Sequence, residues 1–322
     1  MAVTRARPRV VFMGTPEFAV PSLRELARGF EMVAVVTQPD RPSGRGQRLA
    51  ASKVALAAQE LGLPVMKPET LKSQELVAEI SRLSPDLFAV VAFGSILTPE
   101  WLRVPRLGAI NLHGSLLPEY RGASPVQRAL WDGRGGTGVT TIWMDEGIDT
   151  GDCILQRWTP IEPGDTAGTL ALRLSELGAP LLAESLVLAA REEAPRSRQR
   201  EPGSYAKKLA KRDGLVDFSA DAVTIWNRQR AVTPWPGATT GYDSRRVLIV
   251  ESRPHDLLPG VAAPGTVLEV AGRVVVVACG LGSLELRRVK PEGGAVMDAI
   301  DWARGTRVSR GARMNWNEEA MT

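Results

Sequence analysis

Short apolar runs alternate with helical patterns throughout the first half of the chain. In the segments between the apolar runs, hydrophobic residues recur every three or four positions, as on one face of a helix. Alternation of this kind is typical of a mostly parallel, Rossmann-like α/β sheet whose strands are connected by helices. We therefore predict strands at residues 10–13, 32–37 and 87–93, and helices at residues 17–27, 52–63 and 71–82.

The same alternation continues to about residue 193. Ser124 can cap a helix, Pro125 suits its first turn, and Gly133 ends it. We predict strands at residues 110–113 and 139–144 and helices at residues 125–131 and 178–193. These elements complete a first domain at residues 1–190.

A different pattern follows a segment, residues 191–206, that is rich in charge, proline and serine and that we interpret as a linker. Beyond it, short β-branched runs are separated by glycine and proline. Several short strands of this kind favour a small, OB-like β-barrel, which forms a second domain at residues 207–322. The predicted strands cover residues 246–252, 265–270, 273–278 and 283–289.

Composition agrees with a globular protein of two domains, because 322 residues exceed one compact core and 44% of them are hydrophobic. The apolar run at residues 10–13 is too short for a signal peptide or a membrane span, so we expect a cytosolic protein without membrane contact. The turn MGTPEF lacks the G-x-G-x-x-G spacing of nicotinamide cofactor sites. Cys153 and Cys279 have no metal-ligand spacing, and we expect buried, reduced thiols.

The net charge of +4 is concentrated locally. Residues 191–212 contain eight basic and three acidic side chains, a surplus that can face phosphates. A charge run is also typical of a solvated linker, and the charges alone favour that alternative.

His113, one of the two histidines in the chain, is separated by a single residue from the amide side chain of Asn111. On an extended segment Asn111 and His113 project to the same side. A strand end whose polar groups satisfy the nearby backbone would look similar. Four carboxylates follow in the turn MDEGIDTGDC, at Asp145, Glu146, Asp149 and Asp152, and the residues themselves do not select among them. An amide, an imidazole and a carboxylate are the groups that acyl transfer to an amine requires.

The motifs NLHGSLLPEYRGASPVQRAL and MDEGIDTGD resemble those of the folate-dependent formyltransferases. GTPEFAVPSL, TQPDRPSGRGQRL, TPWPGATT and PGTVLEV resemble the branch of that family that formylates methionine esterified to initiator tRNA. The resemblance covers nearly the whole chain. It implies an enzyme that uses 10-formyltetrahydrofolate as co-substrate, without a metal, and initiator Met-tRNA as partner. We expect it to act as a monomer.

The resemblance assigns roles residue by residue. Asn111, His113 and Asp149 match the catalytic positions: Asn111 would donate to the oxyanion, and His113, as imidazolium, would stabilise it. Asp149 would orient His113 or hold a water that takes the amine proton. The resemblance also implies a folate-binding loop and a contact for the methionine side chain. The loop comprises Ser115, Leu116, Leu117 and Pro118, and the methionine contact is Phe18.

An arginine-rich loop at residues 40–48 would by composition be a solvated excursion. The resemblance instead implies contact with the tRNA acceptor stem, with Arg45 as the key residue beside Arg41 and Arg48. Basic residues after the linker would then follow the acceptor arm through its phosphates. These residues are Lys207, Lys208, Lys211 and Arg212.

Two alternatives remain. The first is a formyltransferase for glycinamide ribonucleotide or a nucleotide-linked amino sugar, and the second is a non-catalytic RNA-binding protein. The chain departs from the family at Glu119 and at residues 293–295, where basic residues are usual, so contacts in the second domain are expected to be weaker or differently placed. His255 is interpreted as a surface residue without a role.

Overall fold

The computed structural model describes residues 7–43, 48–255 and 262–315. The chain divides into two compact units. Unit 1 comprises Met1–Pro125, Gly136–Pro160 and Ala171–Ala206, and unit 2 comprises Val126–Gly135, Ile161–Leu170 and Lys207–Thr322. The functional division that we expect at residues 190 and 207 stays a prediction.

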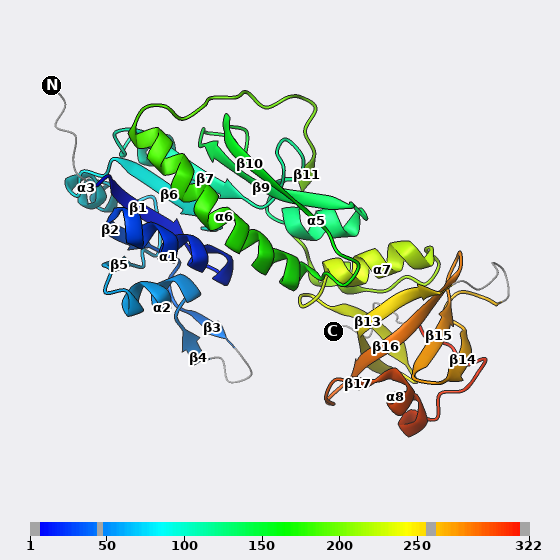
Figure 1. Ribbon diagram of the computed structural model, residues 1–322. Coiled ribbons are helices and arrows are strands. Elements are labelled where there is room, and N and C mark those ends of the chain that lie inside the picture. Colours follow the sequence, from blue (N-terminus) through cyan, green and yellow to red (C-terminus); the bar gives the residue numbers. More distant parts are fainter. Residues whose placement is uncertain (1–6, 44–47, 256–261, 316–322) are drawn as a thin grey trace. The chain divides into compact units, whose positions relative to one another are not determined.

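Unit 1 is built on a seven-stranded sheet in the order β10-β9-β7-β6-β1-β2-β5 (Figure 1). Five strands are parallel, whereas β9 runs antiparallel to β7 and β10 antiparallel to β9. The mostly parallel sheet predicted from the sequence is therefore confirmed. The strands are β1 (Arg9–Gly14), β2 (Glu31–Val36), β5 (Val65–Met66), β6 (Leu87–Val91), β7 (Gly108–His113), β9 (Gly136–Trp143) and β10 (Cys153–Pro160).

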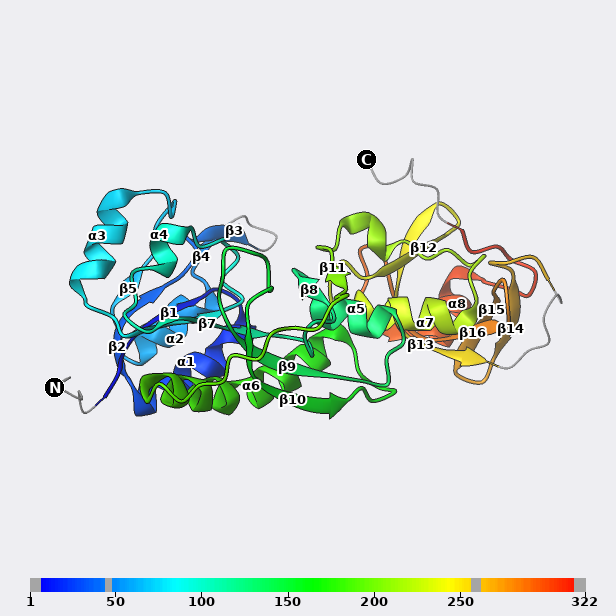
Figure 2. The same ribbon diagram turned by 90° about the horizontal axis from the view of Figure 1, so that it is seen from above.

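Helices cover both faces of this sheet, which explains why β1 and β6 are apolar along nearly their whole length. Figure 2 shows α3 and α4 on one side of the sheet and α1 and α6 on the other. Ser52 and Ser73 cap α2 and α3 by accepting backbone hydrogen bonds. The helical elements up to residue 190 are η1 (Glu17–Ala19), α1 (Val20–Gly29), α2 (Lys53–Glu60), α3 (Gln74–Arg82), α4 (Pro99–Leu102), α5 (Pro125–Trp131) and α6 (Ala167–Ala190). All of α5 after Pro125, and the first turn of α6, fall in unit 2.

Helix α6 differs from its predicted bounds of 178–193, because it begins at Ala167 and ends at Ala190. Its interior contains Pro180, which removes one backbone hydrogen bond without ending the helix. Gly178 does not end a helix either. An ideal Cβ on Gly178 would lie 2.6 Å from Leu112 Cδ2, so this glycine lets α6 approach β7 closely.

Two small pairings lie beside the main sheet. The hairpin of β3 (Arg41–Ser43) and β4 (Arg48–Ala50) forms part of the arginine-rich loop. The strands β8 (Arg121–Gly122) and β11 (Tyr205–Ala206) pair in parallel. Together with a bridge between Cys153 and Ser197, the second pairing ties segment 191–206 to unit 1.

Unit 2 contains a six-stranded antiparallel sheet in the order β12-β13-β16-β15-β14, with β17 beside β16. The segment before Asn315 connects its two edges, because Asn315 N donates to Gly241 O of β12 and Val267 N of β14 donates to Ala312 O. The prediction of a second domain built from short strands is confirmed, and these strands are antiparallel. Its strands are β12 (Ala238–Tyr242), β13 (Arg245–His255), β14 (Val267–Ala271), β15 (Val274–Ala278), β16 (Ser283–Pro291) and β17 (Met297–Asp298), and its helical elements are η2 (Lys211–Gly214), α7 (Ala222–Ala231) and α8 (Ala299–Thr306).

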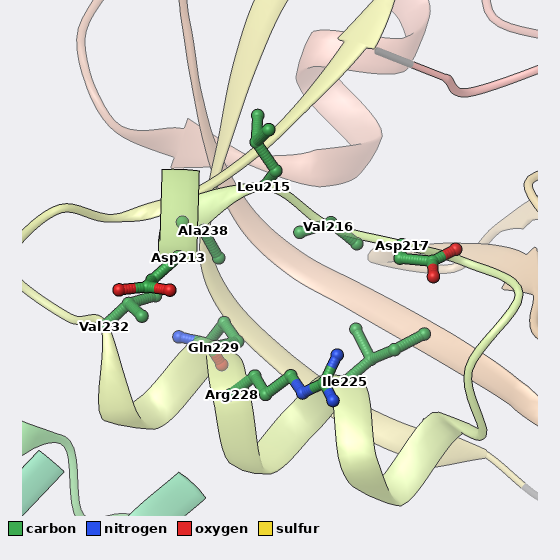
Figure 3. A pocket seen from close by; sticks show the side chains of 10 residues that line it. Asp213, Leu215, Val216, Asp217, Ile225, Arg228, Gln229, Val232 and Ala238 are labelled. Carbon is green, nitrogen blue, oxygen red and sulfur yellow. The ribbon is translucent and has the colours of Figure 1, made fainter. Parts of the chain in front are cut away.

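A pocket in unit 2 lies between η2 and α7 (Figure 3). Asp213, Arg228 and Gln229 line it together with apolar side chains such as Val232. The Gln229 amide is already engaged, because it donates to Val250 O at 2.9 Å and accepts from Ser252. This amide therefore serves to hold α7 against β13.

Both cysteines are free thiols, and burial raises the pKa of each, that of Cys279 to about 12. Cys279 is buried, as expected. Cys153 is only partly buried, which corrects the expectation, because it begins the edge strand β10. Within the described residues, no helix is long and apolar enough to cross a membrane.

We predict that Asp221→Ala lowers the free energy of unfolding by about 1 kcal/mol, because Asp221 caps α7 by accepting from Thr224 N at 2.8 Å. Asp221→Asn keeps an acceptor and is the matched control. The hydrogen bonds from Thr224 lower the pKa of Asp221. Its contribution is therefore complete above the unfolded-state pKa and is lost as pH falls through the lower folded-state pKa. Urea unfolding at pH 7 and at about pH 2, to which the loss extends, measures both effects. Equal destabilisation by alanine and asparagine at pH 7 would contradict the cap.

Candidate active site

Strand β7 places Asn111 and His113 on the same side of the sheet, as the alternation of an extended strand requires. The strand is fixed on both edges, in parallel by β6 and antiparallel by β9. His113 is 5% exposed, whereas Asn111 is partly open to solvent. The two side chains thus have a rigid base.

Asp149 meets both of them. Asn111 Nδ2 donates to Asp149 Oδ1 at 3.3 Å, and His113 Nδ1 lies 3.4 Å from Asp149 Oδ2. The backbone N–H of Gly122 donates to Oδ2 at 2.8 Å. The amide, the imidazole and one carboxylate therefore gather at one point.

The His113 ring has an acceptor on each side. Its Nε2 lies 2.8 Å from the carbonyl oxygen of Tyr120, which can only accept, so Nε2 carries a hydrogen. Its Nδ1 faces the Asp149 carboxylate. A neutral ring donates from one nitrogen only, whereas the imidazolium donates from both. The hydrogen-bonding surroundings thus suit the doubly protonated ring.

The turn that carries Asp149 is tightly shaped. Asp149 has a φ of +54°, a left-handed conformation that aspartate adopts more readily than most residues. An ideal Cβ on Gly151 would lie 1.7 Å from Trp143 O, so only glycine fits there. Asp145 closes the turn by accepting from Thr150 Oγ1 and Gly147 N. Of these two carboxylates, Asp149 is the one that reaches β7.

Two residues that the sequence did not single out hold this turn. Gln199 is 8% exposed, and its Nε2 donates to Asp149 O and Gly151 O, both at 2.8 Å. Arg121 donates to Gln199 Oε1 from Nε at 3.0 Å and from Nη2 at 2.8 Å. Arg121 belongs to the motif NLHGSLLPEYRGASPVQRAL, whereas Gln199 lies in the charged segment 191–206 and is part of no sequence motif.

The predicted folate loop is bound to β9. Ser115 Oγ donates to Glu119 O, Leu117 N donates to Thr140 Oγ1, and both Ser115 and Leu117 are buried. Leu116 and Pro118 keep partial exposure. Phe18 is partly buried in η1, directly after β1.

The basic residues are placed only in part. Arg41 is exposed on β3, and Arg48 is the first residue of β4. Arg45 lies outside the described residues. His255 is partly buried at the end of β13, which corrects its interpretation as a surface residue, because its strand is paired with β16. The basic residues at the start of unit 2 are all exposed, namely Lys207, Lys208, Lys211 and Arg212.

Comparison with known proteins places the chain among the formyl transferases. The family model described as formyl transferase matches residues 8–186, and that of the formyl transferase C-terminal domain matches residues 208–307. The chain belongs to this family. More narrowly, it belongs with the methionyl-tRNA formyltransferases. It is 43% identical to that of Geobacter sulfurreducens, over 95% of this chain and 96% of the relative, and 45% identical to that of Symbiobacterium thermophilum, over 95% of each.

Solved structures share the fold at lower identity. An N-formyltransferase from Helicobacter canadensis, in complex with folinic acid and dTDP-3-aminofucose, matches with a TM-score of 0.64 and 19% identity over 87% of this chain and 98% of that protein. HypX from Aquifex aeolicus, in complex with tetrahydrofolic acid, matches with a TM-score of 0.61 and 17% identity over 97% of this chain. The chain spans about half the length of HypX, 51%.

We predict that Gly151→Ala displaces the turn that carries Asp149, because the added methyl group would collide with Trp143 O. The chain has only two histidines, so NMR signals of the His113 ring can be followed directly. They should shift in Gly151→Ala, while those of His255 stay unchanged. Gly164→Ala, where a methyl group meets nothing within 4 Å, is the control. Unchanged His113 signals in Gly151→Ala would show that the turn does not position the carboxylate.

Proposed function

We propose that this protein transfers the formyl group of 10-formyltetrahydrofolate to the α-amino group of methionine on initiator tRNA. The observation that carries the proposal is the convergence of Asn111 and His113 on the Asp149 carboxylate. Membership of the formyl transferases and 42% to 45% identity to methionyl-tRNA formyltransferases support it. The other formyltransferase substrates and the non-catalytic alternative are not favoured.

The reaction forms one C–N bond and breaks another. The neutral amine attacks the formyl carbon, negative charge develops on the formyl oxygen, and the bond to N10 of the folate then breaks. Asn111 donates a hydrogen bond to this oxygen, a contact whose loss typically costs 10² to 10³ in rate, as an order of magnitude. His113 as imidazolium stabilises the same charge and supplies a proton to the departing nitrogen.

Asp149 has two oxygen atoms in different surroundings. Oδ2 accepts from Gly122 N and faces His113, which orients the imidazolium and balances its charge. In the part of the chain that the structure describes, Oδ1 accepts one hydrogen bond, a longer one of 3.3 Å from Asn111 Nδ2. We assign to Oδ1 the reception of the amine proton, directly or through an ordered water, since a carboxylate oxygen can accept more than one hydrogen bond.

Apolar side chains near the cluster in the chain, and in the loop after the neighbouring strand β6, fit a flat co-substrate. Two isoleucines leave large apolar surfaces open to solvent: Ile96, in the loop after β6, is 73% exposed, and Ile148, next to Asp149, is 47% exposed. Leu116 and Pro118 add partly exposed apolar walls, while the buried Ser115 and Leu117 keep the loop in place. A pterin ring requires apolar walls with polar groups at its edge. When bound, the co-substrate supplies the activated formyl group.

The tRNA is held by charge in this proposal. Phe18 contacts the methionine side chain, the arginine loop contacts the acceptor end, and the basic residues from Lys207 onward follow the phosphates. The catalytic work belongs to residues 1–190, which also carry the arginine loop, and the remaining tRNA contacts belong to the linker and residues 207–322. Because charged initiator tRNA is used at the ribosome, we place the reaction in the cytoplasm, with the protein acting as a monomer.

One assay tests the function as a whole. The protein is given 10-formyltetrahydrofolate with Met-tRNA, with free methionine or with glycinamide ribonucleotide, and formylated product is measured. We expect product from Met-tRNA alone. Formylation of glycinamide ribonucleotide in place of Met-tRNA would overturn the proposal.

We predict that Asn111→Ala and His113→Ala each lower kcat about 10²-fold or more, because both side chains act on charge that exists mainly in the transition state. Folate affinity should change little. Asp149→Asn should be similarly damaging, whereas Asp145→Asn, which alters only the turn, is the matched control. Single-turnover formylation measures these rates. If Asp145→Asn proves the more damaging of the two, the assigned carboxylate is wrong.

We predict that Arg45→Ala raises KM for Met-tRNA and lowers kcat, since a small error in the position of the amine costs rate steeply. Lys208→Ala should weaken tRNA binding modestly and reduce the slope of log K against log salt by up to about one unit. Formylation is measured across a salt series, and folate binding is followed separately. The salt dependence distinguishes a residue that positions the amine from one that attracts the tRNA phosphates. Arg45→Ala with unchanged formylation at every salt concentration would remove the arginine loop from the tRNA site.

A further inference from the structure

Tyr205 is an exposed aromatic residue beside the catalytic cluster. It lies on β11, paired with Arg121 of β8, and 56% of its surface is open to solvent. Its ring rests against Gly122: an ideal Cβ on this glycine would lie 2.8 Å from Tyr205 Cε2 and 2.9 Å from Cζ. One side of the ring is thus supported by backbone, while much of the rest remains uncovered.

The supporting residue is itself bound to the carboxylate. Gly122 N donates to Asp149 Oδ2, so a single residue separates the ring from the site of amine attack. The backbone on either side is also fixed, because Tyr120 N donates to Ser204 Oγ at 2.7 Å and Ala123 N donates to Ala206 O at 3.0 Å. The ring is therefore held by its neighbours before any substrate arrives.

Exposure by itself does not distinguish Tyr205. Trp158, on the edge strand β10, is 60% exposed and also lies against a glycine, Gly136. Gly136, however, pairs with Pro160 at the far end of the β9–β10 hairpin from the Asp149 turn. Tyr205 differs because its glycine binds Asp149 and because two exposed lysines, Lys207 and Lys208, follow it in the chain. Basic side chains next to an uncovered aromatic ring are typical of contacts with single-stranded nucleic acid.

We propose that the Tyr205 ring is the platform on which the 3′-terminal adenine of the tRNA stacks, an inference that rests on the proposed function. The methionine is esterified to the ribose of that unpaired nucleotide. Seven covalent bonds join its amine to the base, a span of about 8 Å at most. An amine at Asp149 therefore requires the adenine to lie close by. Stacking on Tyr205 positions the amine without reading any base edge.

The experiment measures binding of uncharged initiator tRNA and of the same tRNA without its 3′-terminal adenosine. Base–aromatic stacking corresponds to a change in affinity of about 5- to 150-fold. We expect the unchanged protein to bind intact tRNA tighter by a factor in this range. In Tyr205→Ala the factor should fall to near one, while Tyr205→Phe and the matched control Trp158→Ala should keep it. If Tyr205→Ala fails to fold, Tyr205→Leu, which fills the space without a ring, takes its place.

Two outcomes overturn the inference: a factor near one in the unchanged protein, or a full factor in Tyr205→Ala or Tyr205→Leu. Formylation of Met-tRNA by the unchanged protein is measured in parallel. If formylation proceeds while Tyr205→Ala still prefers intact tRNA over the shortened tRNA as strongly as the unchanged protein does, only the stacking of adenine on Tyr205 is wrong. If it does not proceed with any Met-tRNA, the proposed function fails, and the platform fails with it.

Discussion

Everything in the candidate site depends on how the Asp149 carboxylate is held. Its oxygens face three groups that come from two separate segments: the side chains of Asn111 and His113 on β7, and the N–H of Gly122 beyond the following loop. A carboxylate accepts several hydrogen bonds at once. It therefore joins these segments into one structure and faces the Nδ1 nitrogen of the histidine.

The sheet makes this arrangement possible through one change of direction. The strands from β5 to β7 are parallel, with β1 and β6 almost wholly buried, which gives a rigid base, and β9 and β10 then add an antiparallel hairpin at the edge. The turn of that hairpin carries Asp149 back to β7. Such a turn would by itself be adaptable, and Gln199, braced by Arg121, fixes it by binding two of its carbonyl oxygens. The charged segment 191–206 thus completes the site.

Features that follow the repeat of a strand or a helix along the chain could be predicted from the sequence. Features that depend on a single contact between distant residues could not. Alternation along β7 was enough to put Asn111 and His113 on one side, and apolar runs located most of the strands. The long helix α6 was predicted to begin only at Gly178, a residue that lies in its interior and is needed for packing against Leu112. Gln199 has no periodic signal at all, since its role comes from a partner fifty residues away. The choice of Asp149 among four acidic residues required the family resemblance.

The spacing of these contacts along the chain also determines when the site can exist during synthesis. Asp149 binds Gly122 across 27 residues, Gln199 binds Asp149 across 50, and Tyr120 binds Ser204 across 84. Contacts between distant positions form late, because the loops they close must be ordered first. A nascent chain on the ribosome therefore contains Asn111, His113 and Asp149 well before the contacts from Gln199 and Ser204 can form. The enzyme becomes complete only after the segment through Ala206 has emerged from the exit tunnel.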